Sequence, residues 1–328
     1  MPVEKRLYKD SMDCEAFRCP ECLASGSLTC QESASSLAIR CDACGAQYPS
    51  REGRPVLIAP SNALFDRNSY LDPAGNGIYT RRRRWCLPSP SVNLSQTRIL
   101  QEMGRRLRDL PGPTVLIVGS GRQRDLIARA LMVSGSKNVE LICTDVDVSA
   151  DVDLYCDAHR LPFASGIFDG VITTAVLEHV LYPETVAGEI MRVIKLGGLL
   201  YSELPFLQQV HEGAYDFTRY TLSGHRRLFN GFREIEAGTV AGPGTVLVWA
   251  LEHFAASLWG GKRLGLAARA LTRVAFFWLK YVDKLLGSNP SAIDSASCTF
   301  IFGERIHGSV PDGDIIKAYR GTRSIKHV

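Results

Sequence analysis

Four of the ten cysteines stand in two pairs whose spacing is typical of a zinc site. The first C-x-x-C turn holds Cys19 and Cys22, and the second holds Cys41 and Cys44. Each turn can present two thiolates to one ion, and the chain between them is long enough for a hairpin that closes a tetrahedral site. We therefore predict structural Zn²⁺, whose binding would supply the folding free energy of a segment of about forty residues. Two disulfides are the alternative.

The stretch TVLIVGSGRQRD, residues 114–125, predicts a buried strand, a glycine turn and a helix. A dinucleotide site requires a third glycine after Gly119 and Gly121, and this chain has none. A nucleoside with an amino-acid tail needs close backbone approach only at the start of the turn, so S-adenosylmethionine fits better. Gly119, Ser120 and Gly121 are cofactor-binding candidates, and Arg122 or the helix N-terminus could hold the cofactor carboxylate.

A second apolar strand over 139–144 ends at Asp145 and Asp147. A carboxylate at the C-terminal end of the strand beside the glycine turn can accept both ribose hydroxyls. We assign this role to Asp145. The alternative for either aspartate is a helix cap or a turn residue.

The run DVDLYCDAHRLPFASGIFDGVITTAVLEHV, residues 151–180, resembles the class I S-adenosylmethionine-dependent methyltransferases. The resemblance spans about Thr114 to Phe206, with five elements in order. It implies an α/β fold: a Rossmann-like class I methyltransferase sheet with helices on both faces. It also implies that Asp157 receives the adenine amino group, that Ala158 offers its backbone to the ring, and that Thr174 belongs to the cofactor site.

Residues 17–60 resemble the zinc-ribbon domain of the small activator subunit of tRNA and release-factor methyltransferases. The two cysteine pairs are followed by Tyr48, Pro49, Gly53 and the short apolar strand PVLIAP. This second resemblance favours a methyltransferase domain in the remainder of the chain.

Polar residues after the fifth strand are the candidates for acting on the acceptor. The stretch HEGAYDFTRYT supplies the catalytic candidates His211, Asp216, Arg219 and Tyr220, and it resembles a pattern of bacterial methyltransferases encoded with glycan and lipid biosynthesis enzymes. An oxygen nucleophile must lose a proton, so His211 is the candidate general base. Asp216 and Arg219 could instead pair with each other. Glu178 and His179 are expected mostly to shape their segment.

The elements that must position these residues divide the chain into successive parts. We expect a zinc ribbon over 1–60, a linker over 61–92, the methyltransferase core over 93–239, a helical insertion over 240–294, the last strand over 295–307 and a polar tail over 308–328. Two helices are expected in the insertion, separated by Gly260 and Gly261. On the second, Arg269, Arg273, Lys280 and Lys284 recur at helical spacing, which predicts one basic face. The stretch 263–287 could then contact a membrane, close as a lid or form a dimer face.

Composition limits the remaining choices. The chain has 328 residues, 45% hydrophobic residues and a formal charge of +4, which is too small to demand a nucleic-acid partner. No signal peptide or membrane span is evident, so we expect a cytoplasmic protein, peripheral at the inner face of the membrane if 263–287 binds lipid. The favoured function is O-methylation of a small-molecule, glycan or lipid-linked acceptor. An RNA methyltransferase that uses the zinc ribbon and Arg81–Arg84, and a catalytically silent partner-binding module, are the alternatives.

Overall fold

The computed structural model describes residues 14–33, 36–71, 87–133, 135, 138–259, 261–286 and 289–322. The chain divides into two compact units. The first comprises residues 1–81, 101–173 and 182–199, and the second comprises 82–100, 174–181 and 200–328. Helix α1 (Gln96–Leu107) and strands β9 (Phe168–Thr174) and β10 (Ile194–Pro205) each run from one unit into the other. The predicted core over 93–239 therefore contributes to both units.

The N-terminal part of the first unit is a small antiparallel sheet that contains the cysteine pairs. Strands β1 (Leu28–Ser33), β2 (Ser36–Cys41) and β3 (Gln47–Tyr48) pair in sequence order. A hairpin of β4 (Ser50–Arg51) and β5 (Arg54–Leu57) follows. Its two turn residues, Glu52 and Gly53, have φ of 50° and 76°, as a two-residue hairpin with a primed turn requires.

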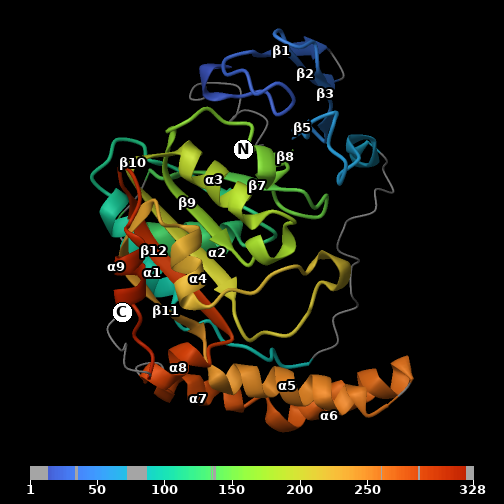
Figure 1. Cartoon of the computed structure of the whole chain (residues 1–328). Helices are drawn as coiled ribbons and strands as arrows, with labels where there is room; N and C mark the ends of the chain where they lie inside the picture. Colours follow the sequence, from blue (N-terminus) through green and yellow to red (C-terminus); the bar gives the residue numbers. More distant parts are fainter. Residues whose placement is uncertain are drawn as a thin grey trace. The chain divides into compact units, whose positions relative to one another are not determined.

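The larger sheet of the first unit has the strand order β9-β6-β7-β8-β5-β4. Strands β7, β8 and β9 of this sheet are labelled in Figure 1. Its central strands are β6 (Thr114–Val118), β7 (Glu140–Asp145) and β8 (Leu154–Cys156), and they pair in parallel. Strand β5 joins β8 in parallel, with Val56 opposite Tyr155. The segment predicted as a separate ribbon therefore extends the Rossmann-like sheet with its last strand.

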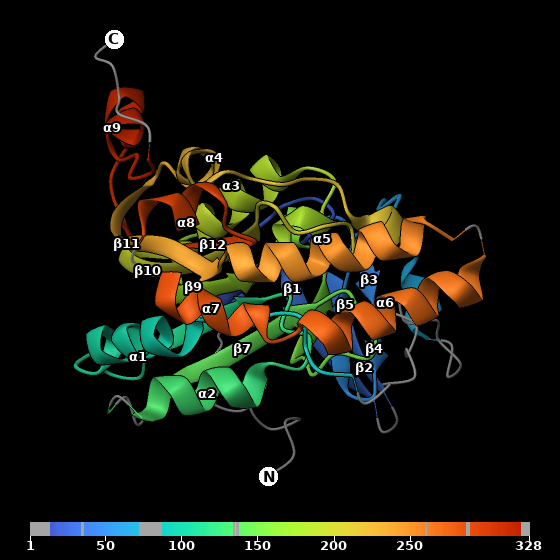
Figure 2. The same ribbon diagram turned by 90° about the horizontal axis from the view of Figure 1, so that it is seen from below.

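Helices cover both faces of this sheet, as predicted. Figure 2 shows α2 (Arg124–Val133) on one side of the parallel strands and α3 (Pro183–Val193) on the other. Residues 115–118 of β6 are almost completely buried, because a parallel strand packed on both faces must be apolar throughout. The predicted α/β fold class is confirmed.

The second unit contains strands in the order β11-β12-β10, with β11 and β12 antiparallel. Its other elements are α4 (Leu222–Leu228), β11 (Phe232–Ala241), α5 (Pro243–Ser257), α6 (Lys262–Phe276), α7 (Leu279–Leu286), α8 (Pro290–Asp294), β12 (Cys298–Arg305) and α9 (Asp312–Lys317). Helix α9 lies in the segment expected as a polar tail, and its Ile315 is buried. Among the described helices, none is long and apolar enough to cross a membrane.

The predicted single basic face over 263–287 is wrong. The helix breaks between Phe276 and Leu279, and three of the four residues of the supposed face make internal polar contacts. Arg273 donates two hydrogen bonds, of 2.7 and 2.6 Å, to the fully buried Glu252. Lys280 is buried and donates to the backbone carbonyl of Ser89 at 2.7 Å. A buried carboxylate needs a cationic partner, and this requirement turns Arg273 inward.

One buried histidine of the second unit predicts an acid-sensitive stability. His225 is fully buried, its Nε2 lies 2.9 Å from the hydroxyl of Ser202, and burial lowers its pKa to about 3 from an ordinary 6.5. Above pH 6.5 the imidazole is neutral in both the folded and the unfolded state, whereas below pH 6.5 only the unfolded state gains the proton. Each pH unit below 6.5 therefore costs about 1.4 kcal/mol of stability.

Replacing His225 by Gln removes this titration and keeps a hydrogen-bonding amide next to Ser202. Between pH 6.5 and 5.0 we expect the unfolding free energy to fall about 2 kcal/mol more in the natural chain than in His225→Gln. Urea denaturation at a series of pH values measures the difference. Parallel pH profiles of the two proteins would contradict the prediction.

Candidate functional site

The two cysteine pairs come together as a four-thiol cluster. The Sγ atoms of Cys19 and Cys44 lie 3.8 Å apart, and those of Cys22 and Cys41 lie 3.7 Å apart. Thiolates at about 2.3 Å from a tetrahedral Zn²⁺ are about 3.8 Å from one another, so the cluster fits the ion and excludes the disulfide alternative. The hydroxyls of Tyr48 and Ser27 lie 3.0 Å from Cys19 Sγ and 3.2 Å from Cys41 Sγ, respectively.

The predicted glycine turn follows β6. Gly119 and Gly121 have φ of 67° and 50°, a left-handed conformation that favours glycine. The Asp145 carboxylate accepts a hydrogen bond from Gly121 N at 2.9 Å and others from the backbone N–H groups of Val146 and Asp147. Burial raises the Asp145 pKa, and these hydrogen bonds oppose that shift. Asp145 therefore joins the end of β7 to the turn, at the place predicted for the ribose.

Two further side chains close the same turn. Ser120 is buried and donates to the Asp151 carbonyl at 3.1 Å. Arg124, at the start of α2, pairs with Asp153 at 2.6 Å and with Asp151 at 3.4 Å. Arg122 is exposed and makes no hydrogen bond or ion pair within the described part of the chain, so its guanidinium is available to an anion.

The predicted adenine-side residues lie after β8. Asp157 is the N-cap of a short 3₁₀ helix, η4 (Ala158–Arg160), so Ala158 is its first residue. The Asp157 carboxylate is bonded by His159 Nδ1 at 2.6 Å and by Asn62 Nδ2 at 2.7 Å. The sequence did not indicate either partner: Asn62 is a polar residue inside the expected linker, and His159 lies beside Ala158 without a distinguishing pattern. Thr174, the remaining candidate, is buried in the second unit at the end of β9.

The acceptor-side candidates lie together in the second unit. Asp216 accepts from the backbone N–H of His211 at 2.9 Å and is paired with Arg219. Burial alone would raise the pKa of Asp216, but the hydrogen bonds from Arg219 and His211 lower it to about 2. The pairing of Asp216 with Arg219, considered above as an alternative, is therefore present. The Tyr220 backbone N–H donates to Pro205, and its side chain is half-buried.

Two residues that were expected mostly to shape their segment join this cluster. Glu178 and His179 end a short 3₁₀ helix, η5 (Leu177–His179), and the rings of His179 and His211 are 5.0 Å apart at their centroids. The hydrogen bond from Phe217 N to Glu178 O, at 2.7 Å, holds the two segments together. Burial raises the pKa of Glu178 to about 8 and lowers that of His179.

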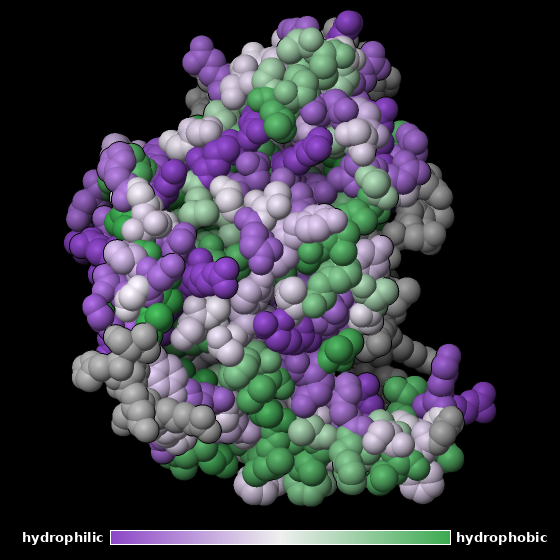
Figure 3. All heavy atoms as spheres, in the orientation of Figure 1, coloured by the Kyte–Doolittle hydropathy of each residue, from purple (hydrophilic) through white to green (hydrophobic). Residues whose placement is uncertain are grey.

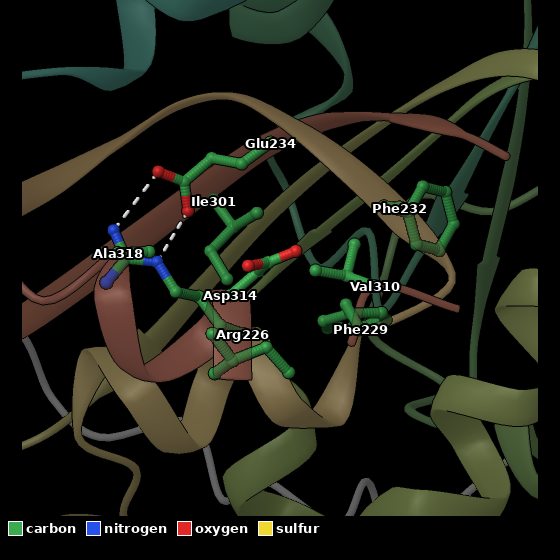
Figure 4. A pocket seen from close by; sticks show the side chains of 9 residues that line it. Arg226, Phe229, Phe232, Glu234, Ile301, Val310, Asp314 and Ala318 are labelled. Carbon is green, nitrogen blue, oxygen red and sulfur yellow. Dashed lines mark hydrogen bonds and ion pairs between the residues drawn. The ribbon is translucent and has the colours of Figure 1, made fainter. Parts of the chain in front are cut away.

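Two hollows of the second unit differ in what they could accommodate. A groove of about 460 Å³ is lined in part by Gln209, Asp216, Arg219 and His253, so it adjoins the loop that carries His211. A smaller cavity of about 70 Å³, shown in Figure 4, holds Arg226 already paired with Glu234. Its size and its satisfied charges exclude a nucleoside, so the groove is the better acceptor candidate.

The parallel sheet, the glycine turn after β6 and the carboxylate at the end of β7 define a Rossmann-like nucleotide-binding unit. Residues 118–202 match the family model described as a methyltransferase domain. These residues belong to a class I S-adenosylmethionine-dependent methyltransferase domain, which follows an N-terminal four-cysteine cluster consistent with a zinc ribbon. The predicted enzyme class and cofactor are confirmed.

A curated relative is the tRNA (carboxymethyluridine(34)-5-O)-methyltransferase alkbh8 of Xenopus tropicalis, which is 29% identical over 168 residues. The match covers 47% of this chain but 24% of the relative, so this chain spans about a quarter of that protein's length. Among solved structures, a chain from a complex that contains the Haloferax volcanii Trm112 methyltransferase activator is 19% identical, with a TM-score of 0.40, and the match covers 65% of this chain and 91% of that chain. Phosphoethanolamine N-methyltransferase 2 of Haemonchus contortus is 13% identical, with a TM-score of 0.38 and coverages of 63% and 52%.

Proposed function

We propose that the chain transfers a methyl group from S-adenosylmethionine to an oxygen atom of a small-molecule, glycan or lipid-linked acceptor. The observation that supports this proposal is the cluster of polar side chains in the second unit that contains His179, His211 and Asp216. An oxygen nucleophile must lose a proton during transfer, and His211 stands on a loop that Asp216 and Arg219 hold in place. The adjacent groove would hold the acceptor.

In this proposal the first unit binds most of the cofactor. Asp145 holds the ribose, Asp157 and Ala158 hold the adenine, and Arg122 holds the carboxylate, while Gly119, Ser120 and Gly121 allow close backbone approach. S-adenosylmethionine supplies a methyl group already activated by its sulfonium, so the chain mainly orients the acceptor and excludes water.

The test uses S-adenosylmethionine labelled in its methyl group and a cell extract separated into lipid, small-molecule and glycan, and RNA fractions. We expect label in the lipid fraction or in the combined small-molecule and glycan fraction, reduced at least tenfold by His211→Ala with cofactor affinity unchanged. His307→Ala, a change at an exposed histidine of the same unit, is the matched control. Equal labelling by the His211 and His307 variants would remove His211 from the proposed reaction.

An exposed apolar surface on the helices of the second unit favours a lipid-linked acceptor over a small molecule or a glycan. Figure 3 shows apolar side chains gathered along α5 and α6, at the lower edge of the view. Leu271 and Leu285 are 73% and 82% exposed, and Lys262, Arg263 and Lys284 are exposed on the same helices. Apolar and basic side chains together suit the surface of an anionic membrane. We propose that α6 and α7 contact such a membrane, at its inner face.

Flotation with phosphatidylglycerol-containing vesicles tests the membrane contact. We expect the natural chain to float and Leu271→Glu/Leu285→Glu to stay in the dense fraction, because two charges would have to enter the lipid interface. Leu126→Glu, at a half-exposed leucine of α2, is the matched control and should float normally. The membrane role would be contradicted if the double variant floated or if the natural chain did not float. Helices α6 and α7 would then be a lid or a dimer face.

RNA methylation is the second candidate, because the curated relative named above is a tRNA methyltransferase. Arg81–Arg84, proposed as phosphate contacts, lie outside the described residues. Salt-dependent RNA binding, together with label in the RNA fraction, would favour this function over the first. A chain that bound no S-adenosylmethionine in calorimetry would instead be a silent partner-binding module.

A further inference from the structure

Glu178 is a buried carboxylate without a hydrogen-bond donor. Its side chain is 1% exposed, and neither carboxylate oxygen has a hydrogen-bond partner among the described residues. A carboxyl group buried in this way ionises only at a cost of several kcal/mol, which a bound cation or hydrogen-bond donors would offset. Nε2 of His179 lies 3.7 Å from Oε1.

Each of the two neighbouring histidines has one ring nitrogen that could bind a metal ion. His179 Nδ1 lies 2.7 Å from the Tyr215 carbonyl oxygen, and His211 Nδ1 lies 3.2 Å from the Gln209 carbonyl oxygen. A carbonyl oxygen can only accept, so Nδ1 of each ring carries the proton and Nε2 is left with a lone pair. Metal-ligating histidines are commonly fixed by this type of bond.

We propose that Glu178, His179 and His211 bind a divalent transition-metal ion. One ligand atom from each residue lies within 4.8 Å of the others, close enough for small side-chain adjustments to bring all three onto one ion. Two imidazoles and a carboxylate suit ions such as Zn²⁺ or Mn²⁺, whereas Mg²⁺ and Ca²⁺ prefer sites made of oxygen. Three protein ligands leave a coordination position open, as in catalytic rather than structural sites.

The role of the ion rests on the proposed function, although its binding does not. A hydroxyl oxygen of the acceptor would occupy the open position, and its pKa would fall because the cation stabilises the oxyanion. The proton passes to solvent. The oxygen then forms a bond to the methyl carbon while the carbon–sulfur bond breaks. The electron pair of the broken bond stays on sulfur, which becomes a neutral thioether. His211 is then a metal ligand rather than the general base.

Metal analysis of the full chain tests the binding. Protein loaded with Zn²⁺ and desalted should hold one ion more per chain than Glu178→Gln or His211→Gln, while all of them keep the ion of the cysteine cluster. His307→Ala should match the natural chain. Co²⁺ provides an independent signature, because the additional ion should add visible absorption without thiolate charge transfer, and this absorption should disappear in both variants.

The outcomes separate the metal site from the proposed function. Glu178→Gln replaces a buried acid by a neutral group of the same shape, so unchanged S-adenosylmethionine affinity will verify its fold. Equal ion content and equal Co²⁺ spectra in the natural chain and both variants would overturn the inference, even if methyl transfer to oxygen is observed. An additional ion in a chain that labels no oxygen acceptor would uphold the site and refute the function.

Discussion

Asp145→Asn is expected to weaken S-adenosylmethionine binding by about a hundredfold, through two effects that act together. Losing a charge-assisted pair of hydrogen bonds to the ribose costs about 1.5–3 kcal/mol. The aspartate also accepts from Gly121 N, so an amide that turns its NH₂ toward that donor would open the glycine turn. Calorimetric titration of the purified variant with S-adenosylmethionine measures the change.

Asp147→Asn is the matched control for this prediction. Asp147 is also buried after β7, but both its oxygens accept from Ser149, in a local turn. We expect less than a threefold loss of affinity, because this variant leaves the Asp145 bond to Gly121 intact. If the two variants lost affinity equally, or if Asp145→Asn bound as tightly as the natural chain, Asp145 would not be the ribose ligand.

Cys41→Ser should release the zinc ion and also weaken cofactor binding by the first unit. Structural zinc contributes roughly 10 kcal/mol or more to the folding of small zinc domains, so the small antiparallel sheet should lose its structure. Asn62, which follows this part of the chain, donates to Asp157, and β5 pairs with β8. Without this support we expect cofactor affinity to fall about tenfold, the equivalent of one lost bond to a charged group.

Metal content and cofactor titration measured on the same sample test the coupling. Ser27→Ala, which removes only the hydroxyl beside Cys41 Sγ, should bind zinc more weakly and keep cofactor affinity when zinc is in excess. Loss of zinc from Cys41→Ser with unaltered cofactor affinity would show that the ribbon does not support the adenine side.

The order of elements and the zinc ligands could be predicted from the sequence. Strand β6, the glycine turn and the acidic end of β7 lie within a few residues of the predicted positions, because buried strands and tight turns leave a local pattern. The cysteine spacing likewise predicts the four-thiol cluster, since each C-x-x-C turn is itself a local structure.

Tertiary structure decided the contacts between distant segments. Asn62 reaches Asp157 across 95 positions, and His211 joins Glu178 and His179 from a separate loop. The break between α6 and α7, with Arg273 turned toward buried Glu252, also lay outside any helical periodicity. Periodicity reports which side of one element is apolar, whereas the partner of a buried charge depends on which elements pack together. The local sequence therefore determined the four-cysteine cluster and the glycine turn. The grouping of His211 with Glu178 and His179 was decided only by the packing of the whole second unit.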